Sequence, residues 1–480
     1  MIAVEAAERP LDAYMQETLQ RLPLADATLS LWAYVLQPTF LAQVFAQYHG
    51  RSYEDTLTFA RFVDLIGDAL VEHEGSGRQS FTRAQEHGTL ATSQEAVYGK
   101  LRRVPLSLSV GFFTEGTARL RTVLPPHHLA TALPASVAEF TVIVGDGKTL
   151  KRVAKRLLPA RGAAGKIYGG KLLVAFLPSQ GIAVAMAADP DGERNECRLV
   201  PQLMEQTRAV VRGPQLWVLD RQFCDLVQTA RCSEAGDHFL IRYHKKVQFR
   251  PDPLRPAAVT WDAQGRRIEE DWGWLGAESN RSRRFVRRLI LIRPGAEAII
   301  LVTDLLDAAR YPAAELLTVY VGRWGIERVF QQITEVFALR HLIGSTPQAT
   351  VFQAAFCLLL YNMVQVLRGY IALAQPQPCL ADELSAEQIF YDVQRELTAV
   401  SVLIPPAMVV NAYTEEVSPE ELCQRLHSLL DSLWTPRWRK AVNTKPRPKV
   451  AKATQSGAHT SMHRLLEKAR QERCAETVAA

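Results

Sequence analysis

The sequence predicts a mixed α/β protein in which a sheet-forming core lies between helical regions at the two ends of the chain. Short apolar runs rich in β-branched residues, the pattern of buried strands, are concentrated between about residues 140 and 303. Helix-start signals and longer periodic segments dominate on either side of that stretch. A chain of 480 residues has room for roughly two to four domains of this kind.

The first region, residues 1–135, is expected to be helical. Thr92 followed by Glu95 is a capping-box signature, and the helix that it opens is expected to end near Pro105. This helix carries three basic residues. They form either a solvated face or a set of contacts to phosphate groups; the three are Lys100, Arg102 and Arg103.

The core is expected to begin in residues 136–245. The run Phe140-Thr-Val-Ile-Val has the composition of a buried strand, and Pro178-Ser-Gln-Gly is a turn signal between two later strands. An order of three strands, a helix and a strand is typical of an RNase H-like fold, although other α/β folds share it. The expected elements are strands at 140–144, 172–176 and 182–187, a helix at 196–207, and strands at 216–219 and 238–243.

The remaining regions are assigned by the same patterns. Residues 246–311 are expected to form a β-rich insertion, with strands at 284–292 and 298–303, and the core is expected to resume at 312–375. Residues 376–480 are expected to form a C-terminal helical region. Ser385 with Gln388, and Ser418 with Glu421, mark two helix starts there.

The end of the chain differs in composition from everything before it. Beyond Trp434 it becomes basic and loses periodicity, which predicts a disordered tail that can hold nucleic acid electrostatically. The basic residues of this tail are Arg437, Arg439, Lys440, Lys445, Arg447, Lys449 and Lys452.

Composition narrows the class of protein only slightly. A net charge of +6 mildly favours an anionic partner. Seven scattered cysteines without a CxxC pair predict no zinc site and suit free thiols in a reducing cytoplasm. The N-terminus has no signal-peptide pattern. The apolar segment 351–374 carries a polar stripe of Asn362, Gln365 and Arg368, so a buried core helix is expected there and not a membrane span.

Two aspartates follow buried apolar runs. Asp146 comes after residues 140–144 in the sequence Val-Gly-Asp-Gly-Lys, and Asp220 comes directly after Leu216-Trp-Val-Leu. Ligands of open α/β sheets gather at the carboxyl ends of strands, and carboxylates placed there can share a Mg²⁺ ion. Each aspartate taken singly has the alternative role of a turn residue or a helix cap.

A third candidate carboxylate lies on a helix expected around residues 320–334. At ~100° per residue, Tyr320, Arg323, Glu327 and Thr334 share one arc beside an apolar face. The alternative is an exposed Arg323–Glu327 salt bridge, worth only about 0.3–0.5 kcal/mol. The two aspartates that end buried strands favour a site over an isolated surface pair.

Together these residues resemble a known family. Tyr320-x₂-Arg323-x₃-Glu327 is similar to the YREK signature of bacterial insertion-sequence transposases of the IS-four group. Asp146 and Asp220 look like the first and second catalytic aspartates of that family. Thr303-Asp304, the segment 342–347 and the segment 359–362 are also similar, so the resemblance covers roughly residues 140–367. The family has a lysine where this chain has Thr334, and that contact is not carried over.

The resemblance implies a DDE transposase with an RNase H-like core and a β-rich insertion. Asp146, Asp220 and Glu327 would be the catalytic and metal-binding residues, holding two Mg²⁺ ions, with Mn²⁺ as a possible substitute. The implied activity is cut-and-paste transposition, by hydrolysis at terminal inverted repeats and strand transfer into target DNA. The implied setting is the bacterial cytoplasm, at the nucleoid when bound, with a homodimer on double-stranded DNA and no membrane partner.

Further residues are expected to contact DNA. Arg323 and Tyr320 would hold phosphate oxygens, and the region 1–135 is expected to bind DNA. The same role is expected of Lys148, Arg221, His244, Lys245 and Lys246. Some members of the family form a hairpin at the transposon end, with an aromatic residue that receives a flipped base. Trp261, Trp272 and Trp274 lie in the corresponding region, with core packing as their alternative role.

Two other functions remain open. A decayed or domesticated copy would bind DNA without cutting it, and Thr334 is the feature in its favour. An RNase H-fold nuclease would cut without transposing and would need no terminal repeats. The sequence contains no Gly-x-Ser-x-Gly elbow, no HExxH and no Walker loop, which argues against an α/β hydrolase.

Overall fold

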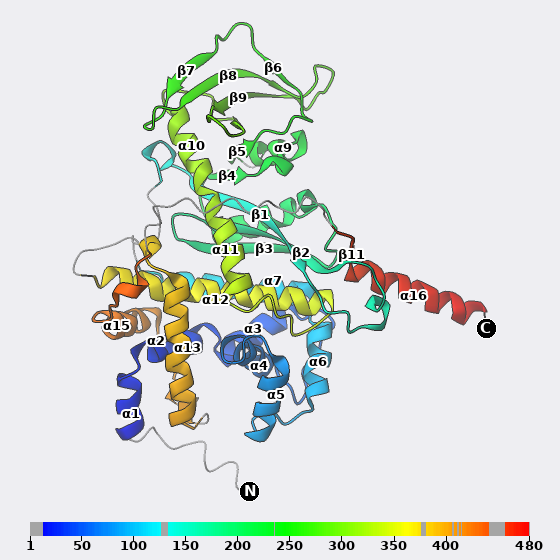
Figure 1. The fold of residues 1–480 in the computed structure, drawn as a ribbon, viewed down its shortest axis with the longest axis vertical. Helices are drawn as coiled ribbons and strands as arrows, with labels where there is room; N and C mark the ends of the chain where they lie inside the picture. The colour runs from blue at the N-terminus through cyan, green and yellow to red at the C-terminus, as the bar shows by residue number, and fades with distance from the viewer. Residues whose placement is uncertain are drawn as a thin grey trace.

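The computed structural model describes residues 13–125, 133–375 except 235, 381–440 except 406, 407, 410, 411 and 414, and 457–479. Three layers follow one another along the longest axis of the molecule (Figure 1). Helices from both ends of the chain form the lower layer, a mixed sheet forms the middle, and further strands form the top. The expected α/β architecture with helical flanks is therefore present.

Seven helices precede the sheet in the described part of the N-terminal region. They are α1 Ala13–Gln20, α2 Pro23–Val35, α3 Pro38–Tyr48, α4 Phe59–Val71, α5 Gly77–Glu86, α6 Gln94–Arg103 and α7 Leu106–Arg121. The expected cap of α6 is wrong by one residue: Ser93, and not Thr92, accepts from Ala96 N at 3.2 Å. The Thr92 hydroxyl is instead buried, with no hydrogen-bond partner among the described residues.

The middle of the chain forms one mixed sheet. Its central strands lie in the order β3, β2, β1, β4, β5, where β1 runs antiparallel to β2 and parallel to β4. β4 and β5 are also parallel, and α8 packs against β2 and β3. The elements are β1 Thr141–Lys151, β2 Lys166–Leu177, β3 Ile182–Asp189, α8 Val200–Val210, β4 Gln215–Leu219, α9 Leu226–Glu234 and β5 His238–Arg242.

The strand-rich segment that follows extends this sheet. β10 pairs antiparallel with β5, and β9, β8 and β6 follow in order, so the segment has no separate sheet of its own. It forms the top of the molecule in Figure 1. The strands are β6 Phe249–Pro251, β7 Ala258–Trp261, β8 Arg267–Leu275, β9 Arg284–Leu291 and β10 Ile299–Thr303, and the last two are the strands expected at 284–292 and 298–303.

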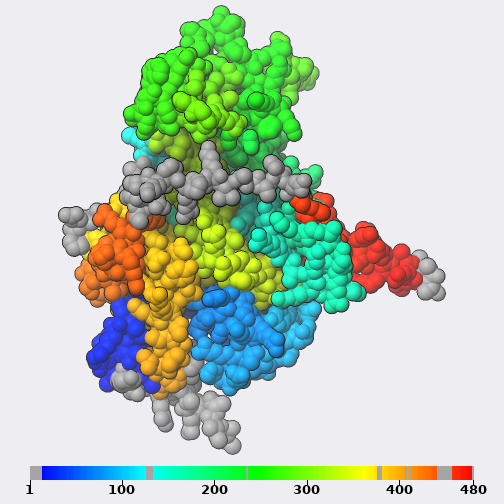
Figure 2. Space-filling view, in the orientation of Figure 1, coloured from blue at the N-terminus to red at the C-terminus, as the bar shows by residue number. Residues whose placement is uncertain are grey.

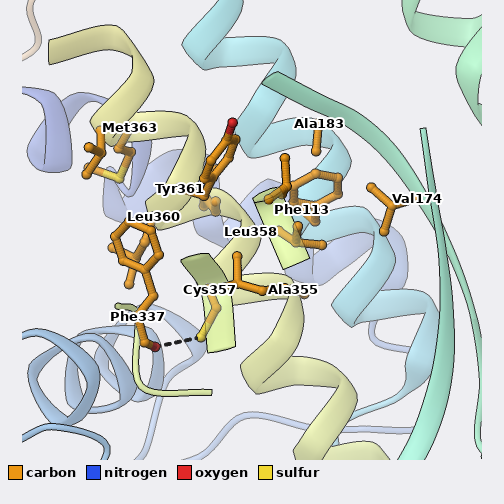
Figure 3. Close-up of a cluster of buried hydrophobic side chains, with 14 of the residues drawn as sticks. Phe113, Val174, Ala183, Phe337, Ala355, Cys357, Leu358, Leu360, Tyr361 and Met363 are labelled. Carbon is orange, nitrogen blue, oxygen red and sulfur yellow. Dashed lines mark hydrogen bonds between the residues drawn. The ribbon is translucent and has the colours of Figure 1, made fainter. Parts of the chain in front are cut away.

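Helix α12 (Pro347–Leu373) runs beneath the sheet and joins the layers. Its length and composition would suit a membrane span, but its most apolar window is completely buried inside the protein. Figure 3 shows part of the apolar core around this helix, where the Cys357 thiol donates to the Phe337 carbonyl at 3.1 Å. The expected polar stripe is buried as well. Asn362 binds the backbone of β3, and Arg368 pairs with Asp382 at 3.0 Å.

The C-terminal region returns to the helical layer. α13 (Ala386–Leu403) and α15 (Pro419–Leu430) pack against α2, and Figure 2 shows these two ends of the chain side by side. Ser385 caps α13 by accepting from Gln388 N, and Ser418 with Glu421 forms a complete capping box on α15. Both helix starts expected here are therefore confirmed.

The expectation of a disordered tail is wrong for residues 457–479. They form β11 (His459–Ser461), which runs parallel to β2, and the helix α16 (Met462–Ala479). Met462 is completely buried against Ile167, and this contact anchors the segment to the sheet. The rest of the segment is mostly polar, so its composition did not predict the contact. Arg437, Arg439 and Lys440 each contact an acidic residue or a carbonyl oxygen instead of facing solvent freely. Lys445, Arg447, Lys449 and Lys452 lie outside the described residues.

Candidate active site

Asp146 and Asp220 lie next to each other on neighbouring parallel strands. The last residues paired between β1 and β4 are Gly145 and Leu219, so each aspartate directly follows this last pair. Parallel strands are about 4.8 Å apart, and equivalent positions point to the same face. The expectation that Asp146 lies at or near a strand end holds for the pairing with β4 alone, because β1 continues to Lys151 along β2.

The helix expected to carry the third carboxylate is divided. α10 (Ala313–Gly322) ends and α11 (Trp324–Glu335) begins around Arg323, which keeps helical angles of φ −53° and ψ −30°. Tyr320 and Glu327 therefore stay on one side across the junction. Ile326, Val329 and Ile333 of α11 are buried, and the helix packs against β1 and α12.

Arg323 joins the carboxylates. Its guanidinium group donates to Asp146 Oδ2 at 3.2 Å and to Glu327 Oε1 at 2.8 Å. The Arg323 side chain is only 6% exposed, so the alternative of a solvated surface pair is excluded for this residue. The Tyr320 hydroxyl donates to Asp220 Oδ1 at 3.3 Å, which brings the remaining carboxylate into the same group of contacts.

The site has an excess of negative charge. Burial raises the pKa of Asp146 to about 6, against the opposing effect of the Arg323 guanidinium. The carboxylates of Glu196 and Asp220 raise that pKa further. Burial also raises the pKa of the Tyr320 hydroxyl to about 12, so it remains a proton donor at neutral pH.

Lys148 and Thr334 meet on α11. Lys148 Nζ donates to the Phe330 carbonyl at 3.2 Å and lies over the Phe330 ring. The Thr334 hydroxyl donates to the same carbonyl at 2.6 Å. Burial lowers the pKa of Lys148 to about 8, with Lys151 adding to this effect. The Lys148 ammonium group thus lies beside the position where the resemblance expects a lysine.

The other residues expected to contact DNA lie at the same edge of the sheet. Arg221 directly follows Asp220 and is exposed. His244, Lys245 and Lys246 follow β5, whose carboxyl end neighbours that of β4, and both lysines are exposed.

The three candidate tryptophans differ in environment. Trp272 donates to the Leu306 carbonyl at 3.0 Å, and Arg287 lies over its ring. Trp274 packs edge-on against Phe285. Trp261 on β7 is 63% exposed, which leaves its ring the most accessible of the three.

Sequence reasoning missed Glu196. Its carboxylate rests against Gly147, in the space that a Cβ atom at position 147 would fill, so glycine is required for this approach beside Asp146. Glu196 pairs with Lys171 at 3.4 Å and accepts from the side-chain amide of Gln222. The available signal was an acidic residue at the start of the helix after the third strand, which by itself suggests only a helix cap.

The side chains of this site are of the type that binds a hard divalent cation. All the donors are carboxylate oxygens, and burial of Asp146 raises its pKa, an effect to which the nearby Glu196 and Asp220 carboxylates add. Among the described residues, no group of three or more His, Cys, Asp or Glu side chains is arranged closely enough to hold a metal ion. The Arg323 guanidinium group stands between Asp146 and Glu327, so a metal bound by both would require Arg323 to move.

Comparison with known proteins finds a transposase domain in part of the chain. Residues 139–363 match the family model described as "Transposase DDE domain", a little under half of the chain, and this stretch contains Asp146, Asp220 and Glu327. Over 210 residues the chain is 24% identical to "Putative transposase y4zB" of Sinorhizobium fredii (strain NBRC 101917 / NGR234). That alignment covers 41% of this chain and 56% of the relative, so the match spans about half of the relative's length.

Solved structures of low sequence identity are also similar, and one of them is described here. It is the piggyBac transposase synaptic complex with hairpin DNA, at a TM-score of 0.38 and 10% sequence identity, covering 84% of this chain and 85% of that chain. The family model and the curated relative support a DDE transposase.

Proposed function

We propose that this protein is a DDE transposase of the IS-four group that cuts and joins DNA through Asp146, Asp220 and Glu327. One observation carries the proposal. Asp146 and Arg323 are 177 residues apart in the chain, yet the fold places them in contact and brings Glu327 and Asp220 to the same cluster. The match of residues 139–363 to a transposase DDE domain supports the same function.

The proposed core is RNase H-like. Three antiparallel strands, then α8, then the parallel strands β4 and β5, follow the order expected of that fold. The β-rich segment 246–311 lies between Asp220 and Glu327, as the proposed family requires. It extends the same sheet beyond β5, which supports a surface long enough to guide a DNA duplex past the carboxylates.

Asp146, Asp220 and Glu327 would hold two Mg²⁺ ions, or Mn²⁺ in their place. When bound, these ions supply a strong nucleophile and stabilise the leaving oxygen. The protein side chains supply position and charge. Tyr320 orients Asp220 through its hydroxyl. Arg323, once released from a carboxylate, is well placed to hold a phosphate oxygen of the cut strand.

Other cations would bind the DNA on either side of the cut. Arg221, Lys245 and Lys246 are exposed at the carboxyl edge of the sheet and would contact backbone phosphates, together with His244. Lys148 would support the strand nearest α11. The proposed partner is double-stranded DNA, as terminal inverted repeats and as target, bound by a homodimer in the bacterial cytoplasm.

The test is nicking of a supercoiled plasmid that carries the terminal repeats flanking the gene. Wild-type protein is expected to convert it to open-circle and linear forms only with Mg²⁺ or Mn²⁺. Asp146→Asn and Asp220→Asn are expected to lower that conversion by about a hundredfold to a thousandfold, comparable to the loss of other charge-stabilising groups. Lys468→Gln, on the exposed surface of α16, is the control and is expected to cut normally.

A second function has one observation in its favour. Thr334 has no positive charge to offer DNA at that position. Its hydroxyl already donates to the Phe330 carbonyl. A decayed or domesticated copy would therefore bind DNA without cutting it, and the plasmid would stay supercoiled with every variant. An RNase H-fold nuclease would instead cut the plasmid equally well without terminal repeats.

A further inference from the structure

Glu196 and Glu327 come from opposite faces of the central sheet. Alternate residues of β1 enter two separate apolar cores, one shared with α11 and the other shared with α8. Glu327 is on α11, and Glu196 opens the short helix η4 (Glu196–Arg198) that leads into α8. Because Asp146 is on β1, between these two layers, the strand that carries it has a glutamate-bearing element on each face.

The carboxylate of Glu196 is held close to both aspartates of the site. It occupies the space beside Gly147 that a Cβ atom would fill, one residue after Asp146. The side-chain amide of Gln222 donates to Glu196, and Gln222 lies two residues after Asp220. Glu196 therefore contacts a near neighbour of each aspartate, although it belongs to a different element of the fold.

A lysine pairs with Glu196 as Arg323 pairs with Glu327. Lys171 Nζ on β2 lies 3.4 Å from Glu196 Oε1, and each of these two side chains is only 12% exposed. On the other face, Arg323 lies 2.8 Å from Glu327 Oε1. Each glutamate is thus held by a cation of the protein, in a place where a bound metal ion would supply positive charge.

The side chains of the site carry more negative than positive charge. Four carboxylates are contacted by two cations within the described residues. The carboxylates belong to Asp146, Asp220, Glu196 and Glu327, and the cations are Arg323 and Lys171. Two negative charges therefore remain when all four carboxylates are ionised. A hard divalent cation has the matching charge and takes carboxylate oxygens as ligands.

We propose that Glu196 is a fourth metal-binding carboxylate of this site, acting on the ion held at Asp146 from the α8 side of the sheet. The inference rests on the proposed function and extends it, because the family resemblance assigns only three carboxylates to metal and gives Glu196 no role. Gln222 keeps the Glu196 carboxylate at the sheet edge. Lys171 is the cation that Glu196 exchanges for metal.

The alternative role of Glu196 is to stabilise the fold alone. In that role its carboxylate would join η4 to β2 through Lys171 and to the segment after β4 through Gln222. Its replacement would then lower the Tm of the protein without changing the affinity for metal. Metal affinity, measured beside the Tm in metal-free buffer, therefore separates the two roles.

The test titrates the full-length protein with Mn²⁺ in the absence of DNA and follows the free ion by electron paramagnetic resonance. Glu196→Gln is expected to raise the Kd for Mn²⁺ by about tenfold to a hundredfold, as the loss of a group that supports a metal site usually does. Lys171→Gln is expected to lower the Kd below the wild-type value, because it removes the cation that competes for Glu196. A purely structural ion pair would not give these opposite effects.

Gly147→Ala tests the same contact without removing a charge, and it keeps the proposal testable if Glu196→Gln does not fold. The added methyl group would take the space of the Glu196 carboxylate, which must then move away from β1. Weaker Mn²⁺ binding is expected again. Glu205→Gln, an exposed glutamate on α8, is the matched control and should leave the Kd unchanged. A thermal melt in EDTA checks the fold of every variant.

The outcomes separate this inference from the proposed function. If Glu196→Gln binds Mn²⁺ with the wild-type Kd while Asp146→Asn does not bind it, the inference is overturned and the site of three carboxylates stands. If the wild-type protein binds no Mn²⁺, both are contradicted. Weaker Mn²⁺ binding by Glu196→Gln, together with a wild type that does not cut terminal repeats, supports the role of Glu196 and counts against the transposase.

Discussion

The guanidinium group of Arg323 lies 3.2 Å from Oδ2 of Asp146, and the two residues come from the junction of α10 and α11 and from β1. A second nitrogen of the same group lies 2.8 Å from Glu327. Arg323 therefore supplies positive charge in the place where a metal ion shared by these carboxylates would supply it. The effect of Arg323 on the carboxylates can therefore be measured without DNA, as a change in protein stability with and without metal.

Arg323→Gln is expected to make the protein less stable without metal and more responsive to metal. Removing one partner from a buried ion pair costs about 3–5 kcal/mol, because the carboxylates are left uncompensated. Mg²⁺ or Mn²⁺ would then raise the Tm of the variant by more than that of the wild type, since binding to the folded state stabilises it. Differential scanning fluorimetry with and without metal measures both effects.

Arg310→Gln is the control for that experiment. Arg310 pairs with Glu139 at 2.6 Å, but both side chains are exposed, so the loss should be no more than about 1 kcal/mol and independent of metal. An equal metal-induced rise in Tm for wild type and Arg323→Gln would show that Arg323 does not stand in the place of a bound cation.

Asn362→Leu is expected to destabilise the protein by about 2–4 kcal/mol. The Asn362 amide accepts from Ala183 N at 3.0 Å and donates to Ala183 O at 2.7 Å, on the outer side of β3. Leucine would leave both backbone groups buried without partners. Urea unfolding followed by circular dichroism gives the free energy of unfolding.

Gln365→Leu provides the matched comparison on the same helix. Gln365 is also completely buried, but neither of its amide atoms has a hydrogen-bond partner in the described structure. Its replacement should be neutral or stabilising, because no partner is lost. If Asn362→Leu lowers the free energy of unfolding by no more than Gln365→Leu does, the Asn362 amide does not stabilise the contact between α12 and the sheet.

His238 is expected to make stability fall as pH rises above neutrality. A hydrogen bond to Asp304, 3.2 Å from Nδ1, raises the pKa of His238 above its usual value despite partial burial. The charges of Asp304, Glu139 and Asp237 act in the same direction. A raised folded-state pKa contributes stability that is complete below about pH 6.5 and is lost as pH rises through the folded value.

The effect is measured as the difference in unfolding free energy between about pH 6 and about pH 8. Because the pair is partly exposed, His238→Gln should remove less than about 1 kcal/mol of that difference. His427→Gln, on the exposed side of α15, should leave it unchanged. If His238→Gln keeps the pH dependence of the wild type, other groups and not His238 cause that dependence.

Local patterns in the sequence were sufficient to locate the strands. The runs at 140–144, 172–176 and 182–187 are parts of β1, β2 and β3, because burial of consecutive apolar residues is visible along the chain. They did not show that β1 continues past Asp146. Its polar residues 146–149 pair with β2, a contact between segments about 25 residues apart that no local pattern contains.

The features of the site that the sequence did not predict depend mostly on contacts between distant parts of the chain. The position of Glu196 against Gly147 depends on how α8 follows β3, and the contact of Lys148 with Phe330 depends on how α11 packs on β1. The structured tail was missed for the same reason. Met462 is a single apolar anchor in a polar segment, and only its place beside Ile167 shows its role.

The most direct test of the central claim is cleavage of a labelled duplex carrying the element's own terminal repeat, comparing wild type with Glu327→Gln. Glutamine keeps an oxygen that can accept from Arg323, so the fold and DNA binding should survive, while a neutral amide binds Mg²⁺ far more weakly. We expect Mg²⁺-dependent nicking at the repeat boundary by the wild type and its loss in the variant, with equal binding by both. Cleavage retained by Glu327→Gln would remove Glu327 from the site, and binding without cleavage by either protein would contradict the assignment of a catalytic transposase.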